Sequence, residues 1–383
     1  MIYLDHAATT PVFPGALEAA WPWVTSEFGN PSSSHEMGLR ASTALEDARR
    51  AIANWLEVSA HEVVFTSGGT EGDNLCVIGL ALANPRGRHI ISARTEHEAV
   101  LGAVEFLERV HDFEVTWLDV DDCGRITLEQ LDRELRDDTT LVTLMHANNE
   151  IGTIHPISEI AQRIRAVGAL MHTDAVQSAG WLDVRPKSLG VDALTVSGHK
   201  LGSPKGSGFV YLRRGVSLEP LLHGGGQEDD RRSGTENVAW AVALATAITT
   251  VVPSGDAREV EATRVTHLRD SLVHDIMAAV PEARVSGDAN SCLPSIAAFT
   301  FAGINGESIL LELESRGVLV SSGAACAAGK DDPSHVLLAC GSAPDTARTA
   351  VRVSLAHTTT ETEVAEATRA FIDAVDQVRS LRT

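Results

Sequence analysis

Three short stretches of this chain carry residue types that can do chemistry. Asp174–Gln177 places a carboxylate at the end of an apolar run, and Ser197–Lys200 places a lysine at the end of another. A lysine amine forms a Schiff base with an aldehyde if its surroundings keep part of it deprotonated. Ser321–Cys326 adds a thiol among small residues. Together the stretches indicate an aldehyde cofactor beside a sulfur nucleophile, which points to sulfur transfer.

Each of these residues also has a plain structural interpretation. A buried carboxylate such as Asp174 needs a partner, which is either a protonated pyridine nitrogen or an arginine or helix N-terminus. Lys200 is either a buried nucleophile or a lysine whose amine extends into solvent. Cys326 is either reactive or an inert thiol in an alanine-rich turn, because reactive cysteines need electropositive surroundings. Cys340, in an apolar helical pattern, is expected to be an inert core thiol.

Further candidates lie where apolar runs give way to turns. Ser67–Glu71, which contains Gly69 and Thr70, is either an ordinary strand-to-helix turn or a phosphate cradle at a helix N-terminus. His97 opens a helix, where it caps the helix or stacks on a flat ring. Asn149 ends a strand in a polar turn, and Thr235 is an N-cap or a phosphate ligand. Arg352 lies inside an apolar strand and is expected to meet an anion, for which a substrate carboxylate is suited.

Composition limits the possible classes of protein. The chain has 383 residues, 44% hydrophobic and 22% charged, which is typical of a globular protein with one large core and a smaller one. A formal charge of −21 disfavours direct binding to nucleic acid or to anionic membranes. The five cysteines include no CxxC pair, so neither a disulfide framework nor a metal site is expected. No secretory signal or membrane-length apolar run is seen, so we expect a cytoplasmic protein.

Short β-rich runs alternate with amphipathic helical patterns along the first two thirds of the chain. Such alternation predicts a mainly parallel sheet covered by helices, with ligands at the carboxyl ends of the strands. Thr70, His97, Asn149, Asp174 and Lys200 all follow predicted strands, as that rule requires. The predicted strands are 62–66, 88–92, 114–118, 140–145, 169–174, 192–197 and 208–213.

The pattern changes after about Val238. A helix over 237–251 leads into another helix, then into β-like stretches at 297–301, 318–321 and 351–355 and a closing helix with Val364 and Phe371. We therefore expect a large α/β domain over 12–250 and a small α+β domain formed by 1–11 and 251–383. The small residues around Cys326 suggest that the loop at about 321–333 can swing.

At this point the chain resembles the group I cysteine desulfurases, in the class V branch of the fold-type I pyridoxal-phosphate enzymes. The matching motifs run in family order over nearly the whole length. They are Tyr3–Thr10, Phe28–Ser33, Phe65–Glu71, Thr95–His97, Asn148–Gly152, Ser197–Lys200, His223–Gln227, Arg232–Thr235 and Ser321–Cys326.

The resemblance implies a homodimer with pyridoxal 5'-phosphate on Lys200. It assigns His97 to ring stacking, Asp174 to the pyridine nitrogen and Gln177 to the ring hydroxyl. Cys326 is the implied sulfur acceptor. The implied phosphate ligands are Gly69, Thr70, Ser197 and His199, with Thr235 from the other subunit, and the implied ligands of the substrate carboxylate are Asn149, Arg352 and Asn30.

The implied reaction removes sulfur from L-cysteine, releases alanine and leaves a persulfide on Cys326. Acceptor proteins for iron–sulfur clusters or for tRNA or cofactor thiolation would then take the sulfur. One departure from the family is that Ala325, Ala327 and Ala328 surround the cysteine where hydroxyl residues are common. The alternatives are a selenocysteine lyase or another class V aminotransferase, which would not need Cys326 in the same way, and a scaffold without productive cofactor.

Overall fold

A seven-stranded sheet forms the centre of the larger part of the molecule. The computed structural model describes residues 1–84, 86–323 and 332–381. The strand order is β2-β8-β7-β6-β5-β3-β4, and only β8 runs antiparallel to its neighbours. Every predicted strand is confirmed to within two residues. The strands are β2 Val63–Thr66, β3 His89–Ala93, β4 Glu114–Leu118, β5 Thr139–Thr143, β6 Leu170–Asp174, β7 Ala193–Ser197 and β8 Gly208–Leu212.

Helices bury both faces of this sheet, because successive side chains of a strand point to opposite sides. Leu141 packs with α3 and α4 on one face, while its neighbour Val142 packs with α2, α6 and α8 on the other. The helical face that was predicted to carry Leu45 and Ile52 is buried in the same hydrophobic cluster as Val142. The helices are α1 Pro14–Thr25, α2 Glu36–Leu56, α3 Gly69–Ala83, α4 Glu98–His111, α5 Leu128–Glu134, α6 Ile157–Val167, α7 Pro186–Leu189 and α8 Val238–Val251.

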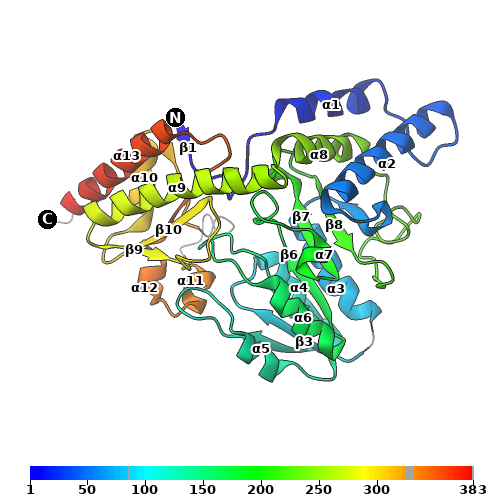
Figure 1. Cartoon of the computed structure of the whole chain (residues 1–383), viewed down its shortest axis with the longest axis horizontal. Helices are drawn as coiled ribbons and strands as arrows, with labels where there is room; N and C mark the ends of the chain where they lie inside the picture. Colours follow the sequence, from blue (N-terminus) through cyan, green and yellow to red (C-terminus); the bar gives the residue numbers. More distant parts are fainter. Residues whose placement is uncertain (85, 324–331, 382–383) are drawn as a thin grey trace.

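A second, smaller unit is built on an antiparallel sheet, β12-β10-β9, covered by long helices. The first strand of the chain, β1 (Ile2–Tyr3), joins this unit by pairing with β11 (Val318–Leu319). In Figure 1 its helices gather on the side where both termini lie. The other elements are α9 Asp256–Ala279, β9 Ala283–Ser286, β10 Ile296–Phe301, α10 Gly306–Ser315, α11 His335–Ala339, α12 Pro344–Ala347, β12 Val351–Ser354 and α13 Glu361–Ser380, with 3₁₀ turns at Ala60–Glu62 and Gly198–Lys200.

The division into domains 12–250 and 1–11 with 251–383 stays a prediction. Two separate hydrophobic clusters support it: Leu4 packs with Phe299 and Phe371 in the smaller unit, apart from the core around the large sheet. The large α/β and smaller α+β arrangement is the predicted fold-type I architecture.

None of the helices in the described residues is both long and apolar enough to cross a membrane alone. The bent pair α8 and α9 passes such a test by length and composition only, and α8 is mostly buried in the protein.

Candidate active site

The carboxyl ends of the parallel strands open into a cavity of about 640 Å³, at the edge of the sheet where a ligand is expected. Most of the predicted site residues line it, although they come from widely separated parts of the sequence. The lining residues that the sequence predicted are Gly69, Thr70, His97, Asn149, Asp174, Gln177, Ser197, His199, Lys200 and Arg352.

The turn between β2 and α3 forms one wall. Gly68 has φ +149°, a conformation that favours glycine, and it directs the chain into the N-terminus of α3. An added Cβ at Gly69 would lie 3.1 Å from Val176, so the small residue keeps this wall open. The positive end of a 15-residue helix beside the Ser197 hydroxyl is suited to a phosphate group.

His199 lies next to this wall. Its Nδ1 is 3.1 Å from the Thr9 hydroxyl. Burial, followed by the charges of Lys200 and Lys205, lowers the pKa of His199 to about 4. His199 therefore meets a ligand as a neutral imidazole at physiological pH.

The amine of Lys200 is held by the N-terminal segment. Its Nζ donates to the carbonyl oxygens of Ala7 at 2.5 Å and Ala8 at 2.6 Å. Gln177 Nε2 donates to the same Ala7 oxygen at 3.0 Å. A strand-to-turn position thus places the amine inside the protein, as predicted, and not out in solvent.

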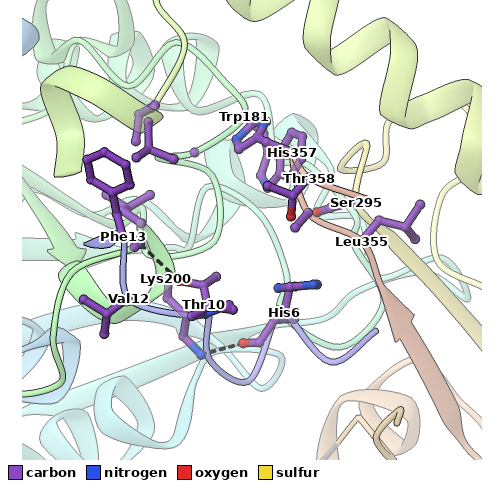
Figure 2. A pocket seen from close by; sticks show the side chains of 18 of the residues that line it. His6, Thr10, Val12, Phe13, Trp181, Lys200, Ser295, Leu355, His357 and Thr358 are labelled. Carbon is purple, nitrogen blue, oxygen red and sulfur yellow. Dashed lines mark hydrogen bonds between the residues drawn. The ribbon is translucent and has the colours of Figure 1, made fainter. Parts of the chain in front are cut away.

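A second cavity, of about 230 Å³, adjoins the first and shares Ala7, Val176, Gln177 and Lys200 with it. Figure 2 shows the Lys200 amine reaching the carbonyl at this boundary, with Trp181 and His357 on the opposite wall. Those two rings stack with centroids 4.0 Å apart. Lys200 therefore lies between two hollows, and only the larger contains the acidic and imidazole groups predicted for catalysis.

Asp174, the last residue of β6, lies in a group of buried acids. Its Oδ1 accepts a hydrogen bond from Val176 N–H at 2.8 Å. Asp73 from α3 is in hydrogen-bonding contact with it, and Glu96 lies close enough for their charges to repel. Burial raises the pKa of Asp174, and His97 and Lys200 oppose that rise. Burial, together with the charge of Asp174, raises the pKa of Asp73 well above its usual range.

Asp73 and Glu96 were missed by sequence reasoning. Their Oδ1 and Oε2 atoms, respectively, are buried without a hydrogen-bond partner. Asp73 Oδ1 lies 3.8 Å from His172 Nε2, but burial lowers the pKa of His172 to about 3, so that ring is neutral. The positions 172 and 174 share one face of β6 because side chains alternate along a strand, and α3 covers that face. The two-residue spacing of His172 and Asp174 was the only sequence signal that polar groups gather on the face of β6 that α3 covers.

His97 is the N-cap of α4. Its Nδ1 accepts a hydrogen bond from Ala99 N–H at 3.1 Å. Because Nδ1 is an acceptor there, the proton of the neutral ring lies on Nε2. His97 therefore caps α4, which was one of its two predicted roles, and its side chain also lines the cavity, while stacking on a flat ring stays a prediction.

Arg352 in β12 is 2% exposed. One end nitrogen donates to Asp5 Oδ1 at 2.9 Å, and the other donates to the carbonyls of Asn149 at 2.7 Å and Gly323 at 3.1 Å. Its Nε is buried without a partner. The anion that Arg352 meets in this structure is the Asp5 carboxylate.

Two predicted residues that the structure describes are not brought into this cavity. Thr235 lines a separate hollow with Ser67 and Trp240, and Asn30 is exposed, with its side chain accepting from Ser32 N–H. Cys326 and most of its loop lie outside the described residues. Cys340 is buried, and burial raises its pKa to about 12, which confirms the prediction of an inert thiol.

Comparison with known proteins places this geometry in a family. The class V aminotransferase model matches residues 2–366. The chain belongs to the class V aminotransferase family. It is 42% identical to a cysteine desulfurase IscS of Dictyoglomus turgidum, over 95% of this chain and 91% of that protein. It is also 42% identical to a putative cysteine desulfurase IscS 1 of Bacillus subtilis, over 98% and 99%.

Solved structures agree. A NifS-like protein superposes with a TM-score of 0.90 at 34% identity, covering 98% of this chain and 99% of that one. A structure titled SspA in complex with cysteine gives 0.80 at 35% identity, covering 93% and 99%. The chain is therefore a pyridoxal-phosphate-dependent enzyme with cysteine desulfurase activity, of the predicted group I type.

The residues present fit pyridoxal phosphate. An amine, a buried carboxylate and a glycine turn at a helix N-terminus line one cavity, which matches the aldehyde, the ring nitrogen and the phosphate. Arg352 adds a guanidinium to the lining of the same cavity, a group suited to the carboxylate of an amino acid.

Proposed function

We propose that the desulfurase reaction takes place in this 640 Å³ cavity, with the roles that the family resemblance assigned. The observation that carries the proposal is that Lys200, Asp174 and Arg352 line one cavity although 178 positions separate the outer two. When bound, the cofactor supplies an electron sink for the bonds at the substrate's Cα.

The chain's own residues then bind, orient and move protons. Lys200 would carry the cofactor and shuttle the Cα proton, since its amine already lies inside the site. Asp174 would hold the proton of the ring nitrogen, Gln177 would contact the ring hydroxyl, and His97 would stack on the ring. Gly69, Thr70, Ser197 and His199 would bind the phosphate.

The substrate carboxylate would meet the Arg352 guanidinium, with Asn149 beside it. Asn148 Oδ1 accepts from the N–H groups of Glu150 at 2.8 Å and Ile151 at 3.0 Å, which fixes the turn that presents Asn149. Cys326 would take the sulfur as a persulfide. Orientation of the substrate by Arg352 decides which bond at Cα faces Lys200.

The test uses Lys200→Ala and Cys326→Ser. The first should be colourless, and the second should stay yellow, bind L-cysteine and yield no protein-bound persulfide from labelled L-cysteine. Alanine formation at the full wild-type rate by Cys326→Ser would contradict the persulfide role. Selenocysteine as the sole productive substrate would favour a selenocysteine lyase.

We also propose a homodimer. Thr235 and Asn30 do not line the cavity of their own chain, so a partner would have to bring them to it. Near Asn30 the surface is apolar, with Trp21 66% and Phe28 70% exposed. Apolar residues gathered in this way mark an interaction surface. The apolar residues concerned are Leu17, Trp21, Val24, Phe28 and Leu39.

Light scattering checks this proposal. Wild type should have twice the chain mass, and Phe28→Asp should shift it toward the monomer and release cofactor. The matched control is Leu311→Asp on α10, which is 61% exposed and far from Asn30 in the chain. A monomeric wild type with full activity would contradict the dimer.

The destination of the sulfur is proposed to be an iron–sulfur scaffold or a thiolation enzyme in the cytoplasm. The named relatives and the four described cysteines, all free, support this. Loading Cys326 with labelled sulfur and following it into host proteins identifies the acceptor. Label that leaves only as free sulfide would contradict protein-to-protein transfer.

A further inference from the structure

His335, the first residue of α11, is fixed beside the catalytic cavity. The preceding Ser334 caps the helix by accepting from Leu337 N–H at 3.1 Å, and its hydroxyl donates to Glu150 Oε2 at 2.5 Å. The imidazole of His335 lines the cavity, and its Nε2 lies 3.0 Å from the backbone carbonyl oxygen of Glu96. The ring is therefore held both through its backbone and at its tip.

These contacts determine which ring nitrogen of His335 carries the proton. A carbonyl oxygen only accepts hydrogen bonds, so Nε2 must be the donor and the lone pair lies on Nδ1. Within the described part of the chain, no hydrogen bond involves Nδ1 of His335. His97 has the opposite tautomer, because its Nδ1 accepts from a backbone N–H. Of these two rings, His97 therefore has its N–H on Nε2 and His335 has its lone pair on Nδ1.

We propose that His335 is a catalytic base, which accepts through Nδ1 the proton that the ammonium group of L-cysteine must lose before it can react. The inference rests on the proposed function of this cavity. An N–H bond of the ammonium breaks, its electron pair stays on the nitrogen, and an Nδ1–H bond forms. The substrate becomes a neutral amine and His335 becomes an imidazolium. The proton returns to the amino group of alanine as the product leaves.

The surroundings favour this transfer. A positive charge on His335 strengthens its hydrogen bond to the Glu96 carbonyl, because hydrogen bonds from charged donors are the stronger ones. His97 would have to break its cap to accept a proton. Nearby carboxylates stabilise an imidazolium, while the cations of the cavity oppose it. The charged and titratable groups that line the cavity with His335 are Asp73, His97, Glu98, Glu150, Asp174, His199, Lys200, Asp332 and Arg352.

The decisive variant is His335→Gln. Glutamine can still donate to the Glu96 carbonyl, but it has no proton affinity near neutral pH. Loss of a general base typically costs about 100-fold or more, so kcat/KM for L-cysteine at pH 7 should fall by about that factor. The deficit should shrink as the pH rises toward the pKa of the substrate's own ammonium group, because more of the L-cysteine then arrives as the neutral amine and needs no base. His267→Gln, on the exposed surface of α9, is the matched control and should leave the pH profile unchanged.

A second readout uses L-alanine, which has the ammonium but no thiol. The rate of the change in visible absorbance of the bound cofactor on adding L-alanine should fall in His335→Gln with the same pH dependence. A wild-type pH profile in this variant, or a defect with L-cysteine alone, would overturn the proposal. If the variant unfolds, His335→Ala with added imidazole decides, because recovered rate supports the base and no recovery overturns it. A wild type that responds to neither amino acid would instead refute the proposed function.

Discussion

Replacing Asp174 by asparagine tests the central electrostatic feature of the site. The change removes a carboxylate that ends a buried strand and leaves its shape almost unaltered. A hydrogen bond to a charged group contributes about 1.5–3 kcal/mol. Since 1.4 kcal/mol is a tenfold change, Asp174→Asn should bind pyridoxal phosphate about 10- to 150-fold more weakly.

Asp73→Asn is the matched control, because the Asp73 side chain is in hydrogen-bonding contact with that of Asp174. Asp73 is 1% exposed, and burial together with the charge of Asp174 raises its pKa well above its usual range, so we expect it to be the protonated member of the pair. Asparagine should therefore replace it with little change in cofactor affinity, less than about threefold, since no charge is lost.

Equilibrium dialysis against pyridoxal phosphate measures both dissociation constants, and the visible absorbance of the bound cofactor reports its protonation. The unloaded Asp174→Asn protein should be no less stable than wild type, because a buried charge is costly. Equal losses of affinity in the two variants would refute the assignment of charge to Asp174 and neutrality to Asp73.

Three further predictions concern stability. Glu228→Ala removes the buried partner of Arg49, since their 2.6 Å ion pair is almost inaccessible to solvent, and leaves the arginine only the more exposed Glu46 as a counter-charge. Breaking such a pair costs about 3–5 kcal/mol, and urea unfolding should show it. Phe371→Ala should cost about 3–5 kcal/mol because the ring is 2% exposed in the smaller core, whereas Leu311→Ala on the surface should change stability by less than about 0.5 kcal/mol. Burial lowers the pKa of His146 from 6.5 to about 4. The folding stability that depends on its neutral ring is therefore fully present above pH 6.5 and is lost as the pH falls toward 4, by up to about 3 kcal/mol. A His146→Gln protein whose acid unfolding is identical to that of wild type would contradict this.

The strands, their alternation with helices and the position of Lys200 directly after a strand followed from the sequence. β-rich runs and amphipathic periods are local properties, so β6 and β7 were placed to within a residue before any tertiary contact was known. Motifs in family order then indicated the cofactor and the reaction. These signals depend on residues close together in the chain, which is why they could be recognised there.

Contacts between distant residues were decided only by the tertiary structure. Arg352 meets Asp5 across 347 positions, and Lys200 meets Ala7 across 193. His335 reaches the Glu96 carbonyl across 239 positions. A local pattern fixes which face of an element a side chain occupies, but partners and tautomers follow from how the elements pack. For that reason the sequence by itself determined the kind of chemistry, while folding decided which acids are buried together and which nitrogen of each capping or cavity-lining imidazole forms its hydrogen bond.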